Sequence, residues 1–205
     1  TQSRSSAASD VYKRQSGKSS LVNKIMGQRV SLVSRKKQST TFNQKVYKKF
    51  SENEFIIQDT PGFFSSRKKI NNNITSSPLA EIETSDLIYV VVDISLRINN
   101  EYKKIINSLE NKIEKQRVFL ILNKIDKVKK DKVLSAIKFY SKEKIFNEIF
   151  PISSLTGEGV ANLIKFSKKF TIKTSIKSKP SSNIQIKKKL FYSEVTREKI
   201  LDKIH

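Results

Sequence analysis

The sequence predicts an α/β domain with a mostly parallel sheet and helices on both of its faces. Short, continuously apolar runs alternate with amphipathic segments from residue 17 to residue 170, and polar motifs directly follow several of those runs. Strands that are buried on both faces are continuously apolar, and their alternation with helices is typical of βαβ units. With 205 residues, the chain has room for one such domain and a short appendage.

The elements follow from hydrophobic periodicity along the chain. Strands are predicted at 46–50, 55–58, 87–92, 117–122 and 148–152, and helices at 21–26, 79–83, 99–115, 131–140 and 160–170. The first two strands flank a polar turn at 51–54, which favours an antiparallel hairpin. The run RVFLIL at 117–122 is the clearest buried strand. The other strands are expected to be parallel.

Composition divides the chain into three parts. Residues 1–15 are polar and rich in Ser without any periodicity, so they look like a foreign or disordered segment. Residues 16–171 contain all the predicted strands. Residues 172–205 begin as a basic linker with Ser and Pro and end in a further predicted helix at 190–204. One folded domain, 16–171, is therefore expected between two appendages.

The chain is strongly basic, with 41 Lys and Arg against 19 Asp and Glu and a net charge of +22. Such a charge suits a partner rich in phosphate, such as RNA, DNA or an anionic membrane surface. Drift in an AT-rich genome produces the same excess of Lys, so charge alone does not choose a partner. The absence of Cys and a single His, His205, argue against disulfides, zinc sites and Ser-His-Asp catalysis.

The chain has no run of about 18 apolar residues that would predict a membrane-spanning helix. Its N-terminus has no apolar segment behind its charges, so we expect no secretory signal. Both observations predict a cytoplasmic protein.

The first motif is Gly17-Lys18-Ser19-Ser20 at the start of a predicted helix. Backbone N–H groups at such a position can cradle phosphates, the Lys18 ammonium can contact the β and γ oxygens, and the Ser19 hydroxyl can bind Mg²⁺. The complete motif has a further Gly five positions before Gly17, and this chain has Tyr12 there.

The second motif is Asp59-Thr60-Pro61-Gly62, directly after the apolar run FIIQ. Its position places the carboxylate at the carboxyl edge of the sheet, where open α/β sheets bind ligands. Asp59 would hold Mg²⁺ through a water, and the Gly62 N–H would meet a γ-phosphate. A plain turn at the end of a strand is the alternative interpretation.

The third motif, Asn123-Lys124-Ile125-Asp126, follows RVFLIL. A carboxylate at Asp126 can accept both the N1–H and the exocyclic amine of guanine, a donor pair that adenine lacks, so it would select GTP over ATP. A helix cap at Asp126 is the alternative. Ser153 and Ser154 follow the last strand and would brace this loop and add a backbone N–H for the guanine O6. The four motifs together predict one nucleotide crevice.

These segments, with SLVSRKKQSTT at 31–41 and REKILDKI at 197–204, resemble the Era-type ribosome-assembly GTPases of the TrmE-Era group. The resemblance runs from about residue 16 to the end. It implies a P-loop GTPase domain at 16–171, Mg²⁺-dependent hydrolysis of GTP, and a switch in the assembly of the small (30S) ribosomal subunit and the maturation of 16S rRNA.

The resemblance also implies residue roles. Thr40, with Thr41 as the fallback, matches the switch threonine that reaches Mg²⁺ and the γ-phosphate. The implied catalytic residues are Lys18, Thr40 and Gly62, and the implied metal ligands are Ser19, Thr40 and Asp59. The implied nucleotide-binding residues are Gly17, Lys18, Ser19, Ser20, Asp59, Thr60, Pro61, Gly62, Asn123, Lys124, Asp126, Ser153 and Ser154. Phe63 stands where other GTPases have a glutamine that orients water.

Two departures from the family are expected to matter. The family has an apolar first strand and Gly-x-Pro-Asn before Gly17, where this chain has residues Tyr12 to Gln15, so we expect weaker GTP binding. In the family an RNA-binding KH domain follows; we expect this chain to lack it, 172–205 to be only its start, and RNA contact to be weakened.

The resemblance favours a monomer and leaves peripheral association with the inner membrane open. Two other functions stay open as well: a tRNA-modification GTPase of the same group, and a basic RNA-binding fragment without nucleotide turnover.

Overall fold

The computed structural model describes residues 16–28, 44–50, 53–59, 85–96, 101–111, 113 and 116–170. The predicted helices at 79–83 and 190–204, the segment before residue 16 and the basic linker lie outside these residues. The expectations about them therefore stay predictions.

A three-stranded parallel sheet forms the centre of the fold, in the order β3 (Leu87–Asp93), β4 (Arg117–Asn123) and β5 (Glu148–Pro151). In the central strand β4 every residue from 118 to 123 is buried, as the apolar run predicts. The register pairs Asp93 with Asn123 and Leu122 with Pro151, so the carboxyl ends of the three strands lie at one edge. The motif at 123–126 and the pair Ser153-Ser154 follow β4 and β5 at that edge. Asp59 instead ends a strand of a separate two-stranded sheet, so its predicted position at the edge of the parallel sheet is wrong.

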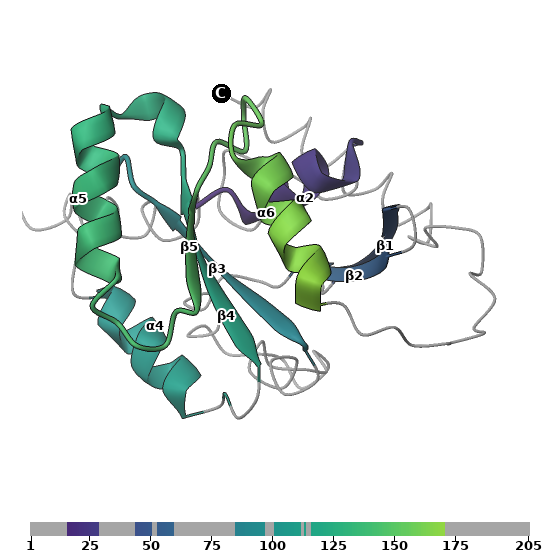
Figure 1. Cartoon of the computed structure of the whole chain (residues 1–205), viewed down its shortest axis with the longest axis horizontal. Helices are drawn as coiled ribbons and strands as arrows, with labels where there is room; N and C mark the ends of the chain where they lie inside the picture. Colours follow the sequence, from purple (N-terminus) through teal and green to yellow (C-terminus); the bar gives the residue numbers. More distant parts are fainter. Residues whose placement is uncertain are drawn as a thin grey trace, which may run out of the picture.

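Helices cover both faces of this sheet (Figure 1). On one face α2 (Lys18–Met26) and α6 (Val160–Ser167) pack against Phe119 and Ile121 of β4. On the other face α5 (Lys130–Tyr140) packs against Leu120 and Leu122, together with Tyr102 of α4 (Glu101–Glu110). Consecutive residues of β4 thus point to opposite cores. The predicted α/β fold is confirmed.

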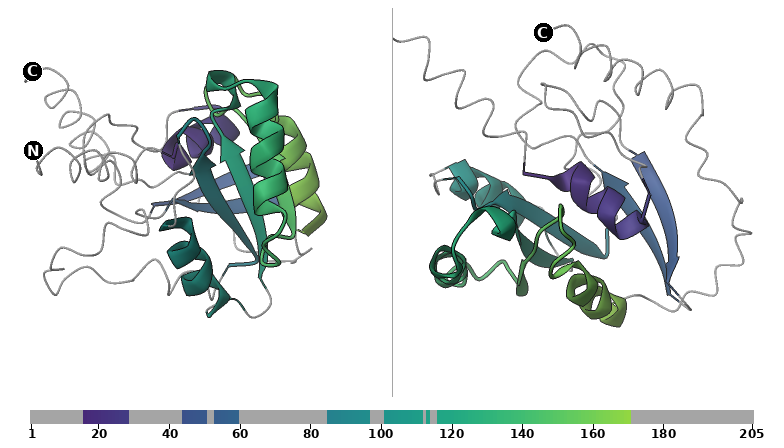
Figure 2. Two further views of the ribbon diagram at one scale, coloured as in Figure 1. Left: turned by 90° about the vertical axis from the view of Figure 1, so that its left-hand side faces the viewer. Right: turned by 90° about the horizontal axis from the view of Figure 1, so that it is seen from above.

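The predicted hairpin is also present, as β1 (Gln44–Phe50) and β2 (Asn53–Asp59). Its strands are longer than predicted, because Phe50 pairs with Asn53 and leaves two residues between the paired strands instead of four. The hairpin lies beside α2 (Figure 2) and packs on it through a cluster of Val22, Met26, Val46 and Ile57.

The other elements end close to their predicted limits. Helix α4 ends at Glu110, before the predicted residue 115, and α6 ends at Ser167 and continues as a short 3-10 helix, η3 (Lys168–Phe170). Within the described part of the chain, no helix combines the length and the apolar character needed to cross a membrane.

Candidate nucleotide-binding site

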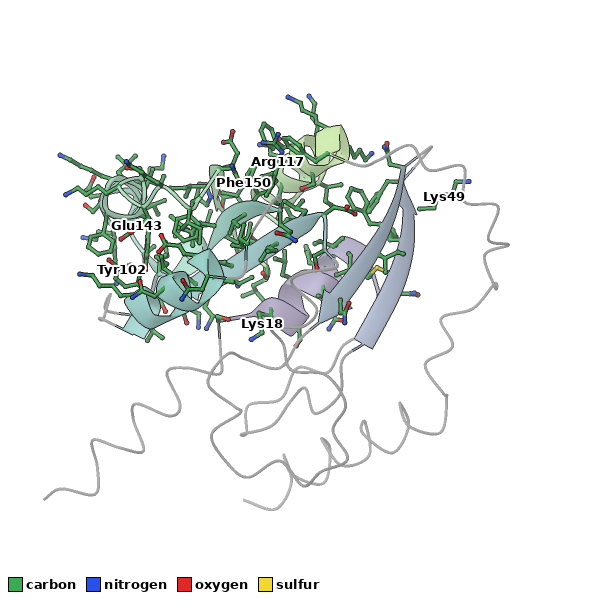
Figure 3. All side chains as sticks on the ribbon, turned by 90° about the horizontal axis from the view of Figure 1, so that it is seen from below. Lys18, Lys49, Tyr102, Arg117, Glu143 and Phe150 are labelled. Atoms are coloured by element: carbon green, nitrogen blue, oxygen red, sulfur yellow. The ribbon has the colours of Figure 1, made fainter. Side chains whose placement is uncertain are left out.

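The start of α2 has the geometry of an anion site. Gly17 caps the helix with a φ of 90°, no side chain caps the helix, and its first turn contains no acid. The first N–H groups of a helix carry partial positive charge, which favours a phosphate at this position. Lys18 and the buried Ser19 belong to the same turn, and Lys18 lies at the start of α2 in Figure 3.

Gly17 is required here for two reasons. Its positive φ is strained for any residue with a Cβ. In addition, a Cβ at this position would lie 2.3 Å from Nδ2 of Asn123. The phosphate segment and the end of β4 are therefore in direct contact.

Asn123 joins this segment to the loop after β5. Its side chain is 1% exposed. Its Nδ2 donates to the Ser16 carbonyl at 2.8 Å, and its Oδ1 accepts from the Ser154 amide at 2.9 Å and the Ser154 hydroxyl at 3.0 Å. One amide side chain therefore fixes two loops that are far apart in the sequence.

Asp126 is held by Ser153, whose hydroxyl donates to Asp126 Oδ1 at 2.5 Å. Ser153 is fully buried, whereas Asp126 is exposed. Asp126 lies within a short 3-10 helix, η2 (Ile125–Lys127), which has Lys124 as its N-cap, and Lys129 is the N-cap of α5. Neither helix has a side-chain cap, so the alternative interpretation of Asp126 as a helix cap is wrong.

The loop after β5 is closed by backbone bonds. The Ser153 amide donates to the Glu158 carbonyl at 3.0 Å, and the Gly157 amide donates to the Ser153 carbonyl at 2.8 Å. Gly159 then starts α6 with a φ of 75°, and a Cβ there would lie 2.4 Å from the Pro151 carbonyl oxygen. The loop therefore presents Ser153 and Ser154 in fixed positions.

Sequence reasoning missed one acidic residue at this edge. Asp93 ends β3 opposite Asn123, and its Oδ2 lies 2.5 Å from Nζ of Lys124. Asp59 was identified as an acid that directly follows an apolar strand, and the same pattern could have identified Asp93.

The remaining predicted site residues are not placed by the structure. Thr40, Thr41, Thr60, Pro61, Gly62 and Phe63 lie outside the described residues, and Asp59 is described only as the backbone at the end of β2. Of the three predicted metal ligands, Ser19 alone has a described side chain. A hydroxyl on the first turn of a helix that favours phosphate fits Mg²⁺, which takes few protein oxygens and completes its shell with phosphates and water.

The described residues offer no rival metal centre. Within them, no group of three or more His, Cys, Asp or Glu could hold a metal ion.

Curated relatives of the chain are GTPases. It is 33% identical over 186 residues to GTPase Era of Clostridium beijerinckii, covering 90% of this chain and 61% of the relative. It is 28% identical to GTPase Era of Erythrobacter litoralis, covering 92% of this chain and 63% of the relative. The chain thus spans less than two thirds of the length of these relatives.

Solved structures of Era share the fold. Era in complex with MgGDPNP and nucleotides 1506–1542 of 16S ribosomal RNA matches with a TM-score of 0.70 and 27% identity, over 79% of this chain and 55% of that one. A variant of Aquifex aeolicus Era bound to GDP·AlF₄⁻ matches with a TM-score of 0.64 and 26% identity, over the same shares.

A family model described as "50S ribosome-binding GTPase" matches residues 13–124. This range is more than half of the chain and extends from the phosphate segment to Lys124 of the third motif. The chain therefore belongs to this family of GTPases.

Proposed function

We propose that this chain binds GTP with Mg²⁺ and hydrolyses it slowly, through a GTPase unit at residues 16–171. The observation that supports this most directly is the connection made by Asn123, which links the anion site at the start of α2 to Ser154. Asp126 stands exposed beside that connection, braced by Ser153.

Asp126 would select the base. Its carboxylate is held by one buried serine and is open to the guanine N1–H and amine, which adenine cannot offer together. The Ser154 amide already donates to Asn123, so we assign the guanine O6 to the amide of Leu155, the next residue of this loop. Lys124 is the N-cap of the short helix that contains Asp126.

The phosphates would lie at the start of α2, with Gly17, Lys18, Ser19 and Ser20 around them. Ser19, Thr40 and Asp59 would hold Mg²⁺, which when bound neutralises charge on the β and γ oxygens. Lys18, Thr40 and Gly62 would position the γ-phosphate for in-line attack by water, with Thr60 and Pro61 shaping the same turn. Phe63 cannot orient that water, so catalysis would consist of positioning and electrostatic stabilisation without a side-chain base.

We further propose that the hydrolysis acts as a switch in the assembly of the small ribosomal subunit, with 16S rRNA as the partner. The similarity to Era, including the complex of Era with a 16S fragment, supports this. The net charge of +22 suits a ribosomal RNA surface. We also propose a monomer that acts in the cytoplasm.

The base assignment is tested with Asp126→Asn. An amide at this position pairs with xanthine and not with guanine, so GTP affinity should fall by about 100-fold or more while affinity for xanthosine triphosphate rises. Isothermal titration with each nucleotide in the presence of Mg²⁺ measures both affinities.

Asp131→Asn is the matched control, because it makes the same chemical change at an exposed acid in the first turn of α5. It should leave both affinities unaltered. An Asp126→Asn variant that still prefers GTP to xanthosine triphosphate would contradict the base assignment. A failure of the unaltered chain to bind GTP would favour the RNA-binding fragment without turnover.

The ribosomal role has a separate test. The chain with a non-hydrolysable GTP analogue is sedimented with purified 30S and 50S subunits, and we expect it to travel with the 30S subunit. The family description names the 50S subunit, so exclusive migration with 50S would replace this proposal. Migration with neither subunit, together with binding to tRNA, would favour the tRNA-modification alternative.

A further inference from the structure

Asp93 is a buried carboxylate to which the four motifs give no role. It is the last residue of β3 and pairs in register with Asn123, and the Ile94 amide continues the ladder by donating to the Asn123 carbonyl at 3.2 Å. Its side chain is 6% exposed. An acid so deeply buried needs partners for both oxygens.

Both oxygens of Asp93 have partners. Oδ1 accepts from the Ser95 amide at 2.9 Å and from the Ser95 hydroxyl at 2.5 Å. Oδ2 accepts from Nζ of Lys124 at 2.5 Å. Three donors on two oxygens fix the direction of the carboxylate, so Ser95 aims Asp93 at Lys124.

Lys124 sits in an unusual backbone conformation. Among the described residues it alone combines a Cβ with a positive φ, at 68°. Such conformations persist where the surroundings hold them and are found at functional sites. The ion pair to Asp93, the hydrogen-bonded Asn123 before it and the hydrogen bond from the Lys127 amide to the Lys124 carbonyl at 3.0 Å all hold this conformation.

The ion pair decides what Lys124 offers to the site. Its ammonium is bound to Asp93 on the neighbouring strand, so its four-carbon stem spans the edge between β4 and β3. A lysine held at its charged end presents that stem as a fixed apolar surface. Its side chain is 23% exposed, and Lys124 is the N-cap of the short helix that contains Asp126.

We infer that Asp93 is a positioning residue for guanine-nucleotide binding, acting through Lys124. This inference rests on the proposed nucleotide function. Because Asp93 acts on the part of the site that binds the guanine base, removing its charge should lower the affinities for GDP and GTP by the same factor. A residue that acted on the γ-phosphate would affect GTP alone.

The test is a double-mutant cycle in the full chain. Asp93→Asn keeps the shape of the side chain and an acceptor for Ser95, but it places an NH₂ group where Lys124 needs an acceptor. We expect GDP affinity to fall about tenfold, the effect of losing a hydrogen bond to a charged group. On the Lys124→Met background the same change should alter GDP affinity by less than about twofold.

Equal losses in both backgrounds would overturn the inference, because Asp93 would then act independently of Lys124. If the original chain binds GDP and Asp93→Asn binds it equally well, the inference is overturned but the proposed function stands. An unaltered chain that does not bind GDP overturns both.

Ser95→Ala keeps the cycle decisive if Asp93→Asn does not fold. It removes one donor to Asp93 without changing any charge, so GDP affinity should fall about threefold, and only while Lys124 is present. Glu143→Gln is the matched control: Glu143 also accepts a hydrogen bond, from Tyr102 at 3.2 Å, but on the side of α4 and α5 (Figure 3). Its GDP affinity should equal that of the unaltered chain.

Discussion

The two ends of β4 are built from different interactions. At the amino end, the Phe119 ring is surrounded by Tyr89, Phe150, Phe166 and Phe170 at centroid distances of 5.3 to 6.1 Å. Arg117 lies 4.7 Å over the Phe170 ring. At the carboxyl end, the Asn123 side chain makes three hydrogen bonds, all to serines.

This difference separates stability from specificity along one strand. Aromatic packing depends on buried area and tolerates small displacements, so it contributes mainly to the free energy of unfolding. Hydrogen bonds of a buried amide depend on direction, and a small displacement leaves donors unpaired. The amino end should therefore govern the stability of the fold, and the carboxyl end the binding of the nucleotide.

The largest effect is expected from Phe119→Ala at the amino end. Truncating a fully buried ring should lower the free energy of unfolding by about 3–5 kcal/mol, because the cavity also removes the contacts of four neighbouring rings. Urea denaturation measures the loss. The ratio of GTP to xanthosine triphosphate affinity should stay unaltered in the folded fraction, and a changed ratio would show that the two ends are coupled.

A smaller loss of stability is expected from Asn123→Ala, of about 2–3 kcal/mol, because the buried Ser154 and the half-buried Ser16 lose their hydrogen bonds. Its effect on GDP binding should be far greater than that of Phe119→Ala, since the phosphate segment loses its connection to Ser154. Titration calorimetry beside urea denaturation separates the two quantities. Full GDP affinity in this variant would show that the site does not depend on the connection.

The smallest effect is expected from Tyr89→Phe, about 1 kcal/mol from the lost contact with the Ser167 hydroxyl at 2.6 Å. Burial raises the pKa of Tyr89 above its ordinary value of 10.0. The unfolded chain therefore releases this proton first as the pH rises, so stability is present below pH 10.0 and falls above it. Urea denaturation on both sides of that pH should show a shallower fall in the variant, and an equal fall would contradict the assignment.

The fold could be predicted because β4 and its neighbours are unambiguous at the level of sequence. A continuous apolar run such as RVFLIL has one stable environment, a strand buried on both faces, and the helices between such runs follow from their spacing. The limits of the hairpin could not be predicted to the residue, because Asn53 favours a turn locally yet pairs with Phe50.

The site could be predicted where the residue type alone indicates what the side chain can bind. Asn123, Asp126, Ser153 and Ser154 do meet at one edge of the sheet. The ion pair of Asp93 with Lys124 could not be predicted, because it joins the ends of two strands and depends on the register between them. The structure does not test the roles of Thr40 and Gly62, which stay predictions.

The hydrogen bond from Asn123 to Ser16 spans 107 positions of the chain, and this has a consequence for folding. During synthesis, α2 is complete long before β4 exists, and the loop that contains Ser154 follows later still. Contacts between distant positions form late, since the chain between them must first lose its freedom. Nucleotide capture should therefore begin only after the strands have assembled, so that GDP stabilises the finished fold and none of its earlier fragments.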